Sequence, residues 1–473
     1  MNRRQKRIFH IWLTILLLLG ASGCMRLGPE YQGPRIGVDI PPRFSNAEAN
    51  VPSKGLRLNW DELFPGLGLE QVISEIGKSN FDVKMAAQRV IEARLQLRQV
   101  QAERFPRLDL KAEAQRQERP IIGIIPGRSF STKTDTFILS GAASYELDLW
   151  GRLARSSEAA LARVLEAEEN RRTVQLTVEA EAVSRYVKMG IIKRRIDISL
   201  KRIANFKKAL MTVKGRYKRG LATQMELRKA TSALARAKSM LPVLREDLLR
   251  SAQELSFLLG RYPKARLVRQ IRPEYINQVA QVPEGLPSTL LLRRPDIRAA
   301  QNMLRALNAE IGVARANRFP HITLTGTYGY SSSELEVLIG PGSKLWSIAA
   351  GLLQPIFDAG RLKAAEKAAV ARYNRGVAQY SKTVLNAFLE VENALVTRKE
   401  QLERRKMVMQ YLTEARAAER LAQSRYTRGL TDYLNLLDSQ RTRFEAEDSL
   451  ALVDLAILTN RVALVRALGG GWK

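Results

Sequence analysis

Very few side chains of this chain could carry covalent or metal chemistry. The 473 residues include one cysteine, Cys24, and two histidines, of which only His321 lies beyond the N-terminal 23 residues. Zinc sites need several such groups together, and His321 is the one histidine that a triad in the mature chain could use, so we expect neither kind of site. Its acidic pairs, Glu168-Glu169 and those between Glu445 and Asp448, lie in helical patterns, where solvated faces are the usual role. We therefore expect no enzyme activity, no metal and no cofactor.

Cys24 follows a pattern that predicts export. A basic start precedes an apolar run from Ile8 to Leu19, and the small residues 21–23 lead into Cys24, as in a cleaved signal peptide. A lone thiol after such a site resembles a bacterial lipobox, whose cysteine is lipidated and becomes the first mature residue; an ordinary secretory signal with an incidental cysteine is the alternative. Met25 stands where lipoproteins retained at the inner membrane often have Asp, so the resemblance implies outer-membrane sorting.

The chain is strongly basic, with 77 Lys and Arg against 47 Asp and Glu. The basic residues are spread over long segments and form no compact nucleic-acid motif, and an exported protein does not meet nucleic acid. Solvated helix faces and contacts with anionic lipid phosphates are the favoured explanations. After Cys24 no charge-free apolar run reaches eighteen residues, so any further membrane insertion is expected through strands.

The chain repeats its own layout. Arg104-Phe105-Pro106 recurs as Arg318-Phe319-Pro320, 214 residues on (318 − 104), and the segment 216–221 recurs at 425–430, 209 residues on (425 − 216). A period above 200 residues is too long for a solenoid unit and indicates a duplicated half. We predict a signal peptide at 1–23, a proline-rich extended segment at 24–66, and repeats at 67–270 and 271–473.

Each repeat contains an alternating segment that predicts a β-hairpin. In the first, at 107–149, apolar residues alternate with polar and charged ones on either side of a predicted loop from Pro120 to Gly127. The second, at 321–358, alternates clearly from Ile322 to Tyr330 and less clearly from Leu345 to Phe357. Four strands cannot close a barrel, and an open sheet edge is not viable in lipid, so several chains must contribute to one barrel.

Long helical patterns lead into and out of these hairpins. A helix predicted from about Leu69 breaks near residues 78–80 and ends before Pro106. Proline-free segments predict helices from about 152 to 214 and from 361 to 424, each about 90 Å long at 1.5 Å per residue. Tight turns at Arg219-Gly220 and Arg428-Gly429 return each chain in a shorter partner, giving antiparallel coiled-coil hairpins at 152–260 and 361–467. A soluble coiled-coil spacer would explain these helices equally well, but not the strands.

Several separate motifs resemble one family. They are Gly28-Pro29-Glu30-Tyr31, Trp60-Asp61-Glu62-Leu63-Phe64, Gly285-Leu286-Pro287-Ser288, Arg293-Arg294-Pro295-Asp296-Ile297-Arg298-Ala299-Ala300, Ile311-Gly312-Val313-Ala314-Arg315-Ala316 and Pro355-Ile356-Phe357-Asp358-Ala359-Gly360-Arg361. They look like the outer membrane efflux proteins, the TolC-like outer membrane factors, in their lipoprotein branch. The resemblance covers nearly the whole mature chain. In Arg294-Pro295-Asp296, a proline and an acid also suit a helix start.

The resemblance implies a fold and an assembly. The fold would be mainly α, with long coiled-coil helices forming a periplasmic tunnel, and four strands per chain would contribute to a trimeric twelve-stranded outer-membrane barrel. A periplasmic adaptor and an inner-membrane pump would complete a tripartite efflux system in a Gram-negative-type bacterium, with this chain as a passive, lipid-anchored exit duct. The rival hypothesis is a lipid-anchored coiled-coil adaptor or structural spacer without a pore.

The same resemblance implies where the duct would close. Leu434, Asp438 and Arg441 are spaced by four and three and so share one helix face beyond the Arg428-Gly429 turn. Leu434 and Asp438 match the family's periplasmic constriction, and Arg441 matches a charge beside it. An apolar ring and a charged ring narrow a pore. Without the family, an Asp and an Arg at this spacing are usually a solvated surface pair.

Further residues near the tips match the family less directly. Tyr426 matches a tyrosine that links neighbouring helices in the closed state, although it could simply pack the turn. Asn435 occupies a position that is Asp in some members. Glu226 and Lys229 hold the equivalent places in the first repeat, and the sequence assigns them no role.

Overall fold

The computed structural model describes residues 26–33, 41–46, 60, 64, 69–125, 128–264 and 288–470. The predicted signal peptide and Cys24 lie outside these residues. The chain divides into two compact units, and each is described by itself. The first unit is formed by Val90–Ala167 and Ala300–Tyr380 with the N-terminal residues, and the second by the rest of the described chain.

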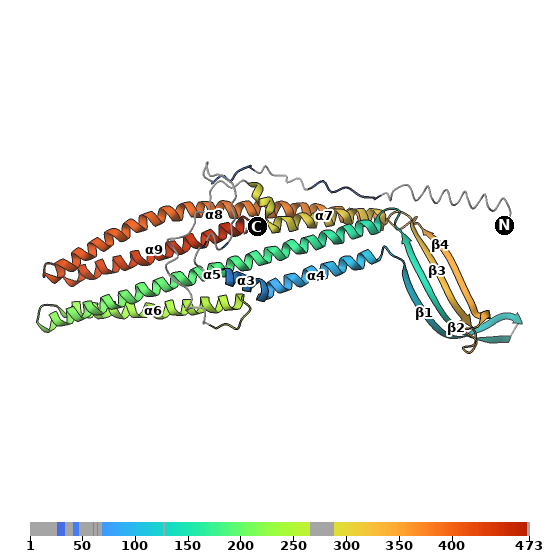
Figure 1. The fold of residues 1–473 in the computed structure, drawn as a ribbon, viewed down its shortest axis with the longest axis horizontal. Helices are drawn as coiled ribbons and strands as arrows, with labels where there is room; N and C mark the ends of the chain where they lie inside the picture. Colours follow the sequence, from blue (N-terminus) through green and yellow to red (C-terminus); the bar gives the residue numbers. More distant parts are fainter. Residues whose placement is uncertain are drawn as a thin grey trace. The chain divides into compact units, whose positions relative to one another are not determined.

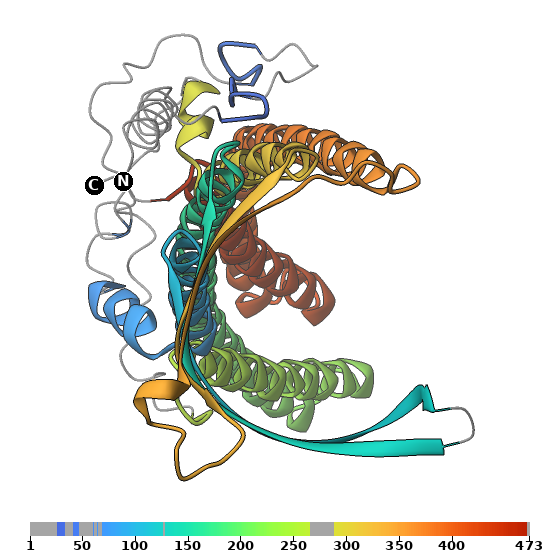
Figure 2. The same ribbon diagram turned by 90° about the vertical axis from the view of Figure 1, so that its right-hand side faces the viewer.

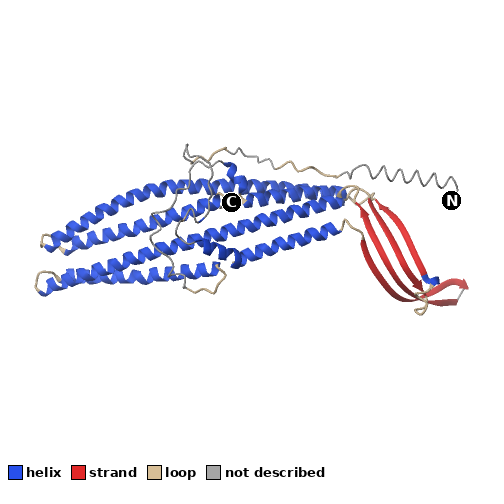
Figure 3. Cartoon of the chain, in the orientation of Figure 1, coloured by secondary structure: helices blue, strands red, loops and turns tan. Residues whose placement is uncertain are grey.

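The first unit contains one antiparallel sheet (Figure 3). Its strands, in spatial order, are β1 (Arg107–Ile125), β2 (Arg128–Leu147), β3 (His321–Ser332) and β4 (Lys344–Leu353). Figure 2 shows the sheet strongly curved. β1 and β4 are the outer strands, and each pairs with one neighbour only within the chain. Both predicted hairpins are therefore present, and together they form one sheet with two open edges.

The strand boundaries correct two predictions. The predicted loop from Pro120 to Gly127 is wrong, because β1 continues through Pro120, which lies opposite Ser131, and ends at Ile125. A proline lacks the N–H that a ladder needs, but β1 is an outer strand that can leave one side unpaired. The fourth strand ends at Leu353 instead of Phe357. Pro355 lies just beyond this end, where a missing N–H breaks no ladder bond.

The sheet has a charged face and an apolar face. On β1, Arg107 contacts Asp109 at 2.9 Å and Lys111 contacts Glu113, both at the two-residue spacing that keeps side chains on one face. On the other face Leu108 is 79% exposed and Leu110 is 80% exposed. On β4, Trp346 and Ile348 are likewise exposed. A single chain therefore leaves this apolar surface without cover.

The N-terminal segment 26–33 packs against helices of the same unit, α5 (Arg152–Lys218) and α7 (Pro295–Ala316). Arg155 of α5 donates to the carbonyl of Leu27 at 3.2 Å, and Asn308 of α7 donates to the carbonyl of Pro29 at 2.8 Å. A Cβ on Gly28 would lie 2.5 Å from the Cα of Gly312, so this approach requires glycine. The extended segment predicted here is fixed by backbone contacts.

The second unit is helical (Figure 1). Four of its elements lie wholly within it: α3 (Leu69–Ser79), α6 (Gln224–Leu258), η3 (Ser288–Arg293) and α9 (Tyr433–Ala467). It also contains the starts of α4 (Phe81–Ala102) and α7, and the larger C-terminal parts of α5 and α8 (Arg361–Thr427). The helices α5 and α8 run three or four residues beyond their predicted ends. Among the residues that the structure describes, no helix is long and apolar enough to cross a membrane.

The predicted break near residues 78–80 and the predicted helix start at Pro295 are both present. The Asn80 side chain accepts from the backbone N–H of Asp82 at 2.8 Å and donates to the carbonyl of Leu258 at 2.8 Å, so it caps α4 and fixes it to α6. At the start of α7, the buried Arg294 contacts Asp296 at 2.8 Å and donates to the carbonyl of Ala467 at 2.6 Å. The Arg-Pro-Asp motif thus starts α7 and fixes it to the end of α9.

Candidate functional site at the helical turns

The candidate site is built on two equivalent turns, one joining α5 to α6 and one joining α8 to α9. In the first, Gly220 has a φ of 71°, and Leu221 donates to the carbonyl of Arg216 at 2.9 Å. In the second, Gly429 has a φ of 76°, and Leu430 donates to the carbonyl of Arg425 at 2.9 Å. This helix ending needs a left-handed residue, which explains the repeated Arg-Gly-Leu signal.

Each returning helix begins with a side-chain cap. Thr223 and Glu226 form a capping box, in which each side chain accepts a hydrogen bond from the other residue's backbone N–H. At α9, Asp432 accepts from the N–H of Asn435 at 3.2 Å. The Asn435 amide also donates to Asp432 at 2.8 Å and to Thr431 at 2.9 Å. Asn435 is therefore engaged in capping its own helix.

Three predicted gate residues lie on one exposed side of α9. Leu434 is 38% exposed, and Asp438 and Arg441 are both exposed. No ion pair joins Asp438 to Arg441 in the part of the chain that the structure describes. The surface pair that the spacing alone would suggest is thus not formed, and all three side chains are free to meet another molecule.

Tyr426 lies on the inner side of the turn and is only 2% exposed. Its ring is 5.8 Å from that of Tyr433, and the guanidinium of Arg216 lies 4.8 Å from its centre. Arg216 also donates to the carbonyl of Tyr426 at 3.0 Å. Burial raises the pKa of Tyr426. Tyr426 therefore packs its turn and joins α8 to α5 within the chain.

Glu226 joins the two hairpins through a backbone contact. One carboxylate oxygen accepts from the N–H of Thr223 at 2.7 Å, and the other accepts from the N–H of Tyr433 at 3.2 Å. The same carboxylate thus stabilises the starts of both α6 and α9, where the helix dipole also favours a negative charge. Lys229, one turn further along, is exposed and forms no ion pair within the described residues.

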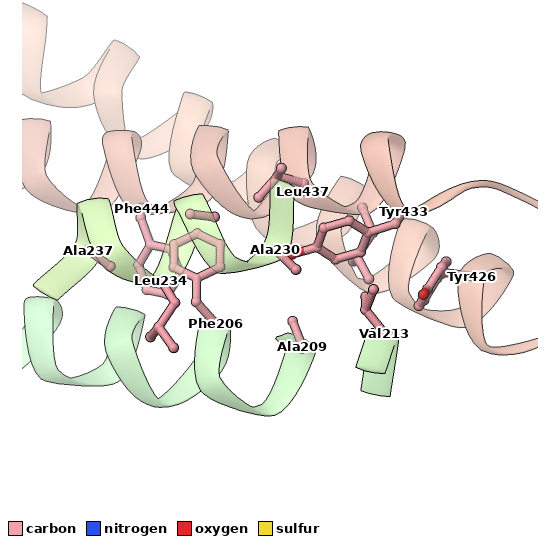
Figure 4. Close-up of a cluster of buried hydrophobic side chains, with 12 residues drawn as sticks. Phe206, Ala209, Val213, Ala230, Leu234, Ala237, Tyr426, Tyr433, Leu437 and Phe444 are labelled. Carbon is pink, nitrogen blue, oxygen red and sulfur yellow. The ribbon is translucent and has the colours of Figure 1, made fainter. Parts of the chain in front are cut away.

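The sequence did not single out the apolar cluster behind these residues. Figure 4 shows side chains from α5, α6, α8 and α9 meeting around Tyr433, which is fully buried, and Phe444. Helix α6 contributes small residues such as Ala230 and Ala237, and α9 contributes large ones. Arg443 lies 3.8 Å from the centre of the Phe444 ring. The signal that could have found this cluster was the pairing of small with large residues at helical spacing.

Ion pairs continue the connection along the helices. Asp454 of α9, whose side chain is 1% exposed, accepts from Arg194 of α5 at 2.8 Å and from Arg405 of α8 at 2.7 Å. Nearby, Arg195 contacts Asp448 through two hydrogen bonds of 2.7 and 3.0 Å. Buried carboxylates with two guanidinium partners fix helix positions strongly, because removing one partner leaves an uncompensated charge.

Comparison with known proteins identifies the family of this chain. Residues 72–261 and 286–470 both match the family model of the outer membrane efflux proteins. The chain belongs to this family. It is 31% identical over 464 residues to the cation efflux system protein CusC of Escherichia coli O6:H1, with 98% of both chains covered. It is 32% identical over 465 residues to the solvent efflux pump outer membrane protein SrpC of Pseudomonas putida, again with 98% of both covered.

A solved structure supports the same assignment. The outer-membrane channel OprN superposes with a TM-score of 0.83 at 28% identity, covering 94% of this chain and 99% of that one. The match in two segments confirms the internal duplication, and the mainly helical fold with one four-stranded sheet is confirmed. This efflux protein is therefore an outer-membrane channel component and not a spacer without a pore.

Proposed function

We propose that this efflux protein is a homotrimeric exit duct that works with a periplasmic adaptor and an inner-membrane pump. The observation that carries the proposal is the open four-stranded sheet, with β1 and β4 unpaired on one side and an exposed apolar face. In lipid, each unpaired backbone group would cost several kcal/mol, so neighbouring copies must pair these edges. Three copies would supply twelve strands.

The duct is passive in this proposal. The names of two relatives specify different cargo, cations for CusC and solvents for SrpC. Such variety within one scaffold is expected when the pump selects the cargo and supplies the energy.

The periplasmic entrance would close at Leu434, Asp438 and Arg441. All three are exposed on one side of α9, as ring-forming residues must be before the copies assemble. Three leucines would form an apolar constriction, and three aspartates with the adjoining arginines would form a charged one. Tyr426 and Glu226 would hold the tips closed from within each chain.

The anchor would be a lipid on Cys24, which lies outside the described residues. Two residues further on, Arg26 lies against Gly151 in the first unit, and the N–H of Leu27 donates to the carbonyl of Trp150 at 3.1 Å. Trp150 lies between the end of β2 at Leu147 and the start of α5 at Arg152. Residues 26 and 27 are therefore held beside the end of β2 that leads into α5, which favours an anchor in the membrane that the strands enter.

Purified full-length protein tests the proposal. We expect a heat-labile trimer on a mild detergent gel, strand signal in circular dichroism, and discrete conductance steps in planar lipid bilayers. A lone subunit that leaves the bilayer impermeable would refute the duct. Mass spectrometry of the N-terminal peptide should show acylation, and an unmodified Cys24 would refute the anchor alone.

A further inference from the structure

The tips of the two helical hairpins differ sharply in charge. The first tip, residues 201–245, contains thirteen basic residues and a single acidic one, Glu226. The segment 209 residues on, 410–454, contains six basic and eight acidic residues. The two segments are equivalent in the duplication, so this difference does not follow from the fold they share.

Most of the basic side chains at the first tip have no internal role. Arg202 lies 5.0 Å from the Phe444 ring centre, and Arg216 holds Tyr426. The other eleven are exposed, and within the described residues none forms an ion pair. They are Lys201, Lys207, Lys208, Lys214, Lys218, Arg219, Arg228, Lys229, Arg236, Lys238 and Arg245.

This arrangement lowers the stability of the tip. Like charges four residues apart on a helix, such as Lys214 and Lys218, destabilise it by about 0.2–0.5 kcal/mol per pair. In the second tip, by contrast, carboxylates form ion pairs: Glu447 contacts Arg416 at 3.0 Å and Asp448 contacts Arg195 at 2.7 Å. The basic side chains of the first tip thus lack acidic partners, whereas carboxylates of the second tip have basic ones. This contrast indicates that the first tip meets a negatively charged partner.

Part of this surface forms one continuous helix face. Leu200, Lys207, Met211, Lys214 and Lys218 of α5 follow each other by seven, four, three and four residues, the spacing of a coiled-coil seam. We call these five residues the lysine face. Leu200 is 45% exposed and Met211 is 68% exposed. The lysine face runs about 27 Å along the helix and combines two apolar side chains with three cationic ones.

We propose that the lysine face is a docking surface for an acidic α-helix of a partner protein. Apolar residues of that helix would cover Leu200 and Met211, and its Glu or Asp side chains would pair with Lys207, Lys214 and Lys218. The proposal rests on the proposed function, which supplies a helical periplasmic partner, and it adds the chemistry of that partner and the hairpin it contacts.

Two other occupants fit less well. A second copy of this chain offers too little negative charge. Apart from Asp432, which caps α9, the second tip has only three exposed carboxylates that form no ion pair: Glu414, Asp438 and Glu445. A lipid surface is flat, whereas the lysine face extends along a helix at heptad spacing. A partner helix matches both the length and the period.

The test uses the full-length trimer in nonionic detergent. The probe is a fluorescent synthetic peptide with Leu at the a and d positions and Glu at the e and g positions of each heptad. Its control carries Gln in place of every Glu, and vesicles of equal phosphatidylglycerol and phosphatidylcholine test the lipid alternative. Fluorescence anisotropy is measured over a salt series, because contacts between exposed charges weaken as salt rises.

Two triple variants remove the same charge from equivalent tips. We expect K207Q/K214Q/K218Q to weaken binding of the acidic peptide about tenfold and to flatten its salt dependence. R420Q/R425Q/R428Q, which changes three exposed residues of the second tip, should alter binding by less than about twofold. M211Q should weaken the acidic peptide while leaving its salt dependence unchanged.

Three outcomes would overturn the proposal: equal loss in both triple variants, equal binding of the Gln peptide, or binding of vesicles but not of the acidic peptide. Thermal unfolding followed by circular dichroism confirms that each variant is folded. Single-channel conductance of the same preparations separates this proposal from the proposed function. A conducting trimer whose lysine face binds nothing would refute only the docking surface.

Discussion

The two helical hairpins have the same backbone and different surfaces. Helices α5 and α8 each contain 67 residues, α6 and α9 each contain 35, and all four boundaries are related by the same offset of 209. Both turns have a left-handed glycine and the same carbonyl contact. The duplication has therefore kept the geometry of the hairpin to the residue, and the differences lie in the side chains.

Equivalent side chains have taken different roles. Met225 and Lys229 stand where the second hairpin has Leu434 and Asp438, so the first hairpin lacks the predicted gate pair. Tyr217 is 40% exposed, whereas its equivalent Tyr426 is buried. The comparison shows that one backbone can hold a buried contact on one copy and a charged surface on the other.

The contrast extends into the apolar cluster. Large residues of α9, such as Tyr433 and Phe444, pack against small residues of α6, such as Ala230 and Ala233. The equivalents of Tyr433 and Phe444 in the first repeat are Gln224 and Ala235. Close packing requires the large side chains of one helix to face small side chains of the other. The sequences of α6 and α9 therefore had to change together at these positions.

The largest effect is expected where a buried tyrosine has an exposed equivalent. Y426A removes the ring that packs on Tyr433 and Arg216, and should destabilise the second tip locally by about 3 kcal/mol. Y217A should change it by less than about 0.5 kcal/mol. Hydrogen exchange measures this loss, and the exchange rate of the α9 amides should rise roughly hundredfold in Y426A. Similar exchange in both variants would show that the turn does not depend on Tyr426.

The gate should also differ between the hairpins. L434S/D438S removes both the apolar and the charged constriction, and should raise single-channel conductance severalfold in planar bilayers. The equivalent pair in the first hairpin, M225S/K229S, should leave conductance unchanged. Equal conductance in all three proteins would remove Leu434 and Asp438 from the gate, and an equal rise in both variants would place the constriction on both hairpins.

Much of this fold could be predicted from the sequence because its signals are local. Prolines and glycines mark the helix ends, and the break at Asn80 and the start at Pro295 follow from capping chemistry. The loop at Pro120 was predicted wrongly, because a proline is tolerated near the end of a ladder in a strand that has one neighbour within the chain. Strand order within the sheet, not the residue alone, decides the outcome.

The site was predicted less completely, for a physical reason. The spacing of Leu434, Asp438 and Arg441 predicts that they share one helix face, and all three are exposed on one side of α9. Their role as a gate was inferred from the family resemblance and stays a prediction. Glu226 could be placed near the turn, but its bond to the N–H of Tyr433 joins residues 207 apart in the chain. Contacts between segments so distant leave no periodic signal in one sequence, and the packing of Tyr433 is of the same kind.

A smaller effect should separate the two helix caps. E226A removes both a capping box and the bond to Tyr433, and should cost about 1–2 kcal/mol at the starts of α6 and α9. The equivalent N435A loses only hydrogen bonds within its own cap, and should cost about 0.5 kcal/mol. Exchange of the Tyr433 amide distinguishes them. E226Q keeps an accepting oxygen, so its Tyr433 amide should exchange at a rate between those of wild type and E226A. If the Tyr433 amide of E226A exchanges as slowly as in wild type, Glu226 does not connect the two hairpins.

The smallest effect under ordinary conditions concerns the hydroxyl of Tyr433. Burial, with a smaller contribution from Tyr426, raises the pKa of Tyr433 to about 12. The unfolded tyrosine has a pKa of about 10, so folding favours the neutral phenol. Its contribution to stability is complete below pH 10 and is lost as the pH rises from about 10 to about 12.

Tyr433 has no equivalent tyrosine in the first hairpin, so Y433F isolates its titration. The hydroxyl has no hydrogen-bond partner within the described residues. Y433F should therefore be at least as stable as wild type at neutral pH, because the buried ring is kept, no bond is broken and an unpaired buried hydroxyl is removed. Above pH 10 the α9 amides of wild type should exchange progressively faster than those of Y433F. If both proteins lose protection in parallel, the alkaline transition of the second tip arises elsewhere, and the buried hydroxyl of Tyr433 is not its source.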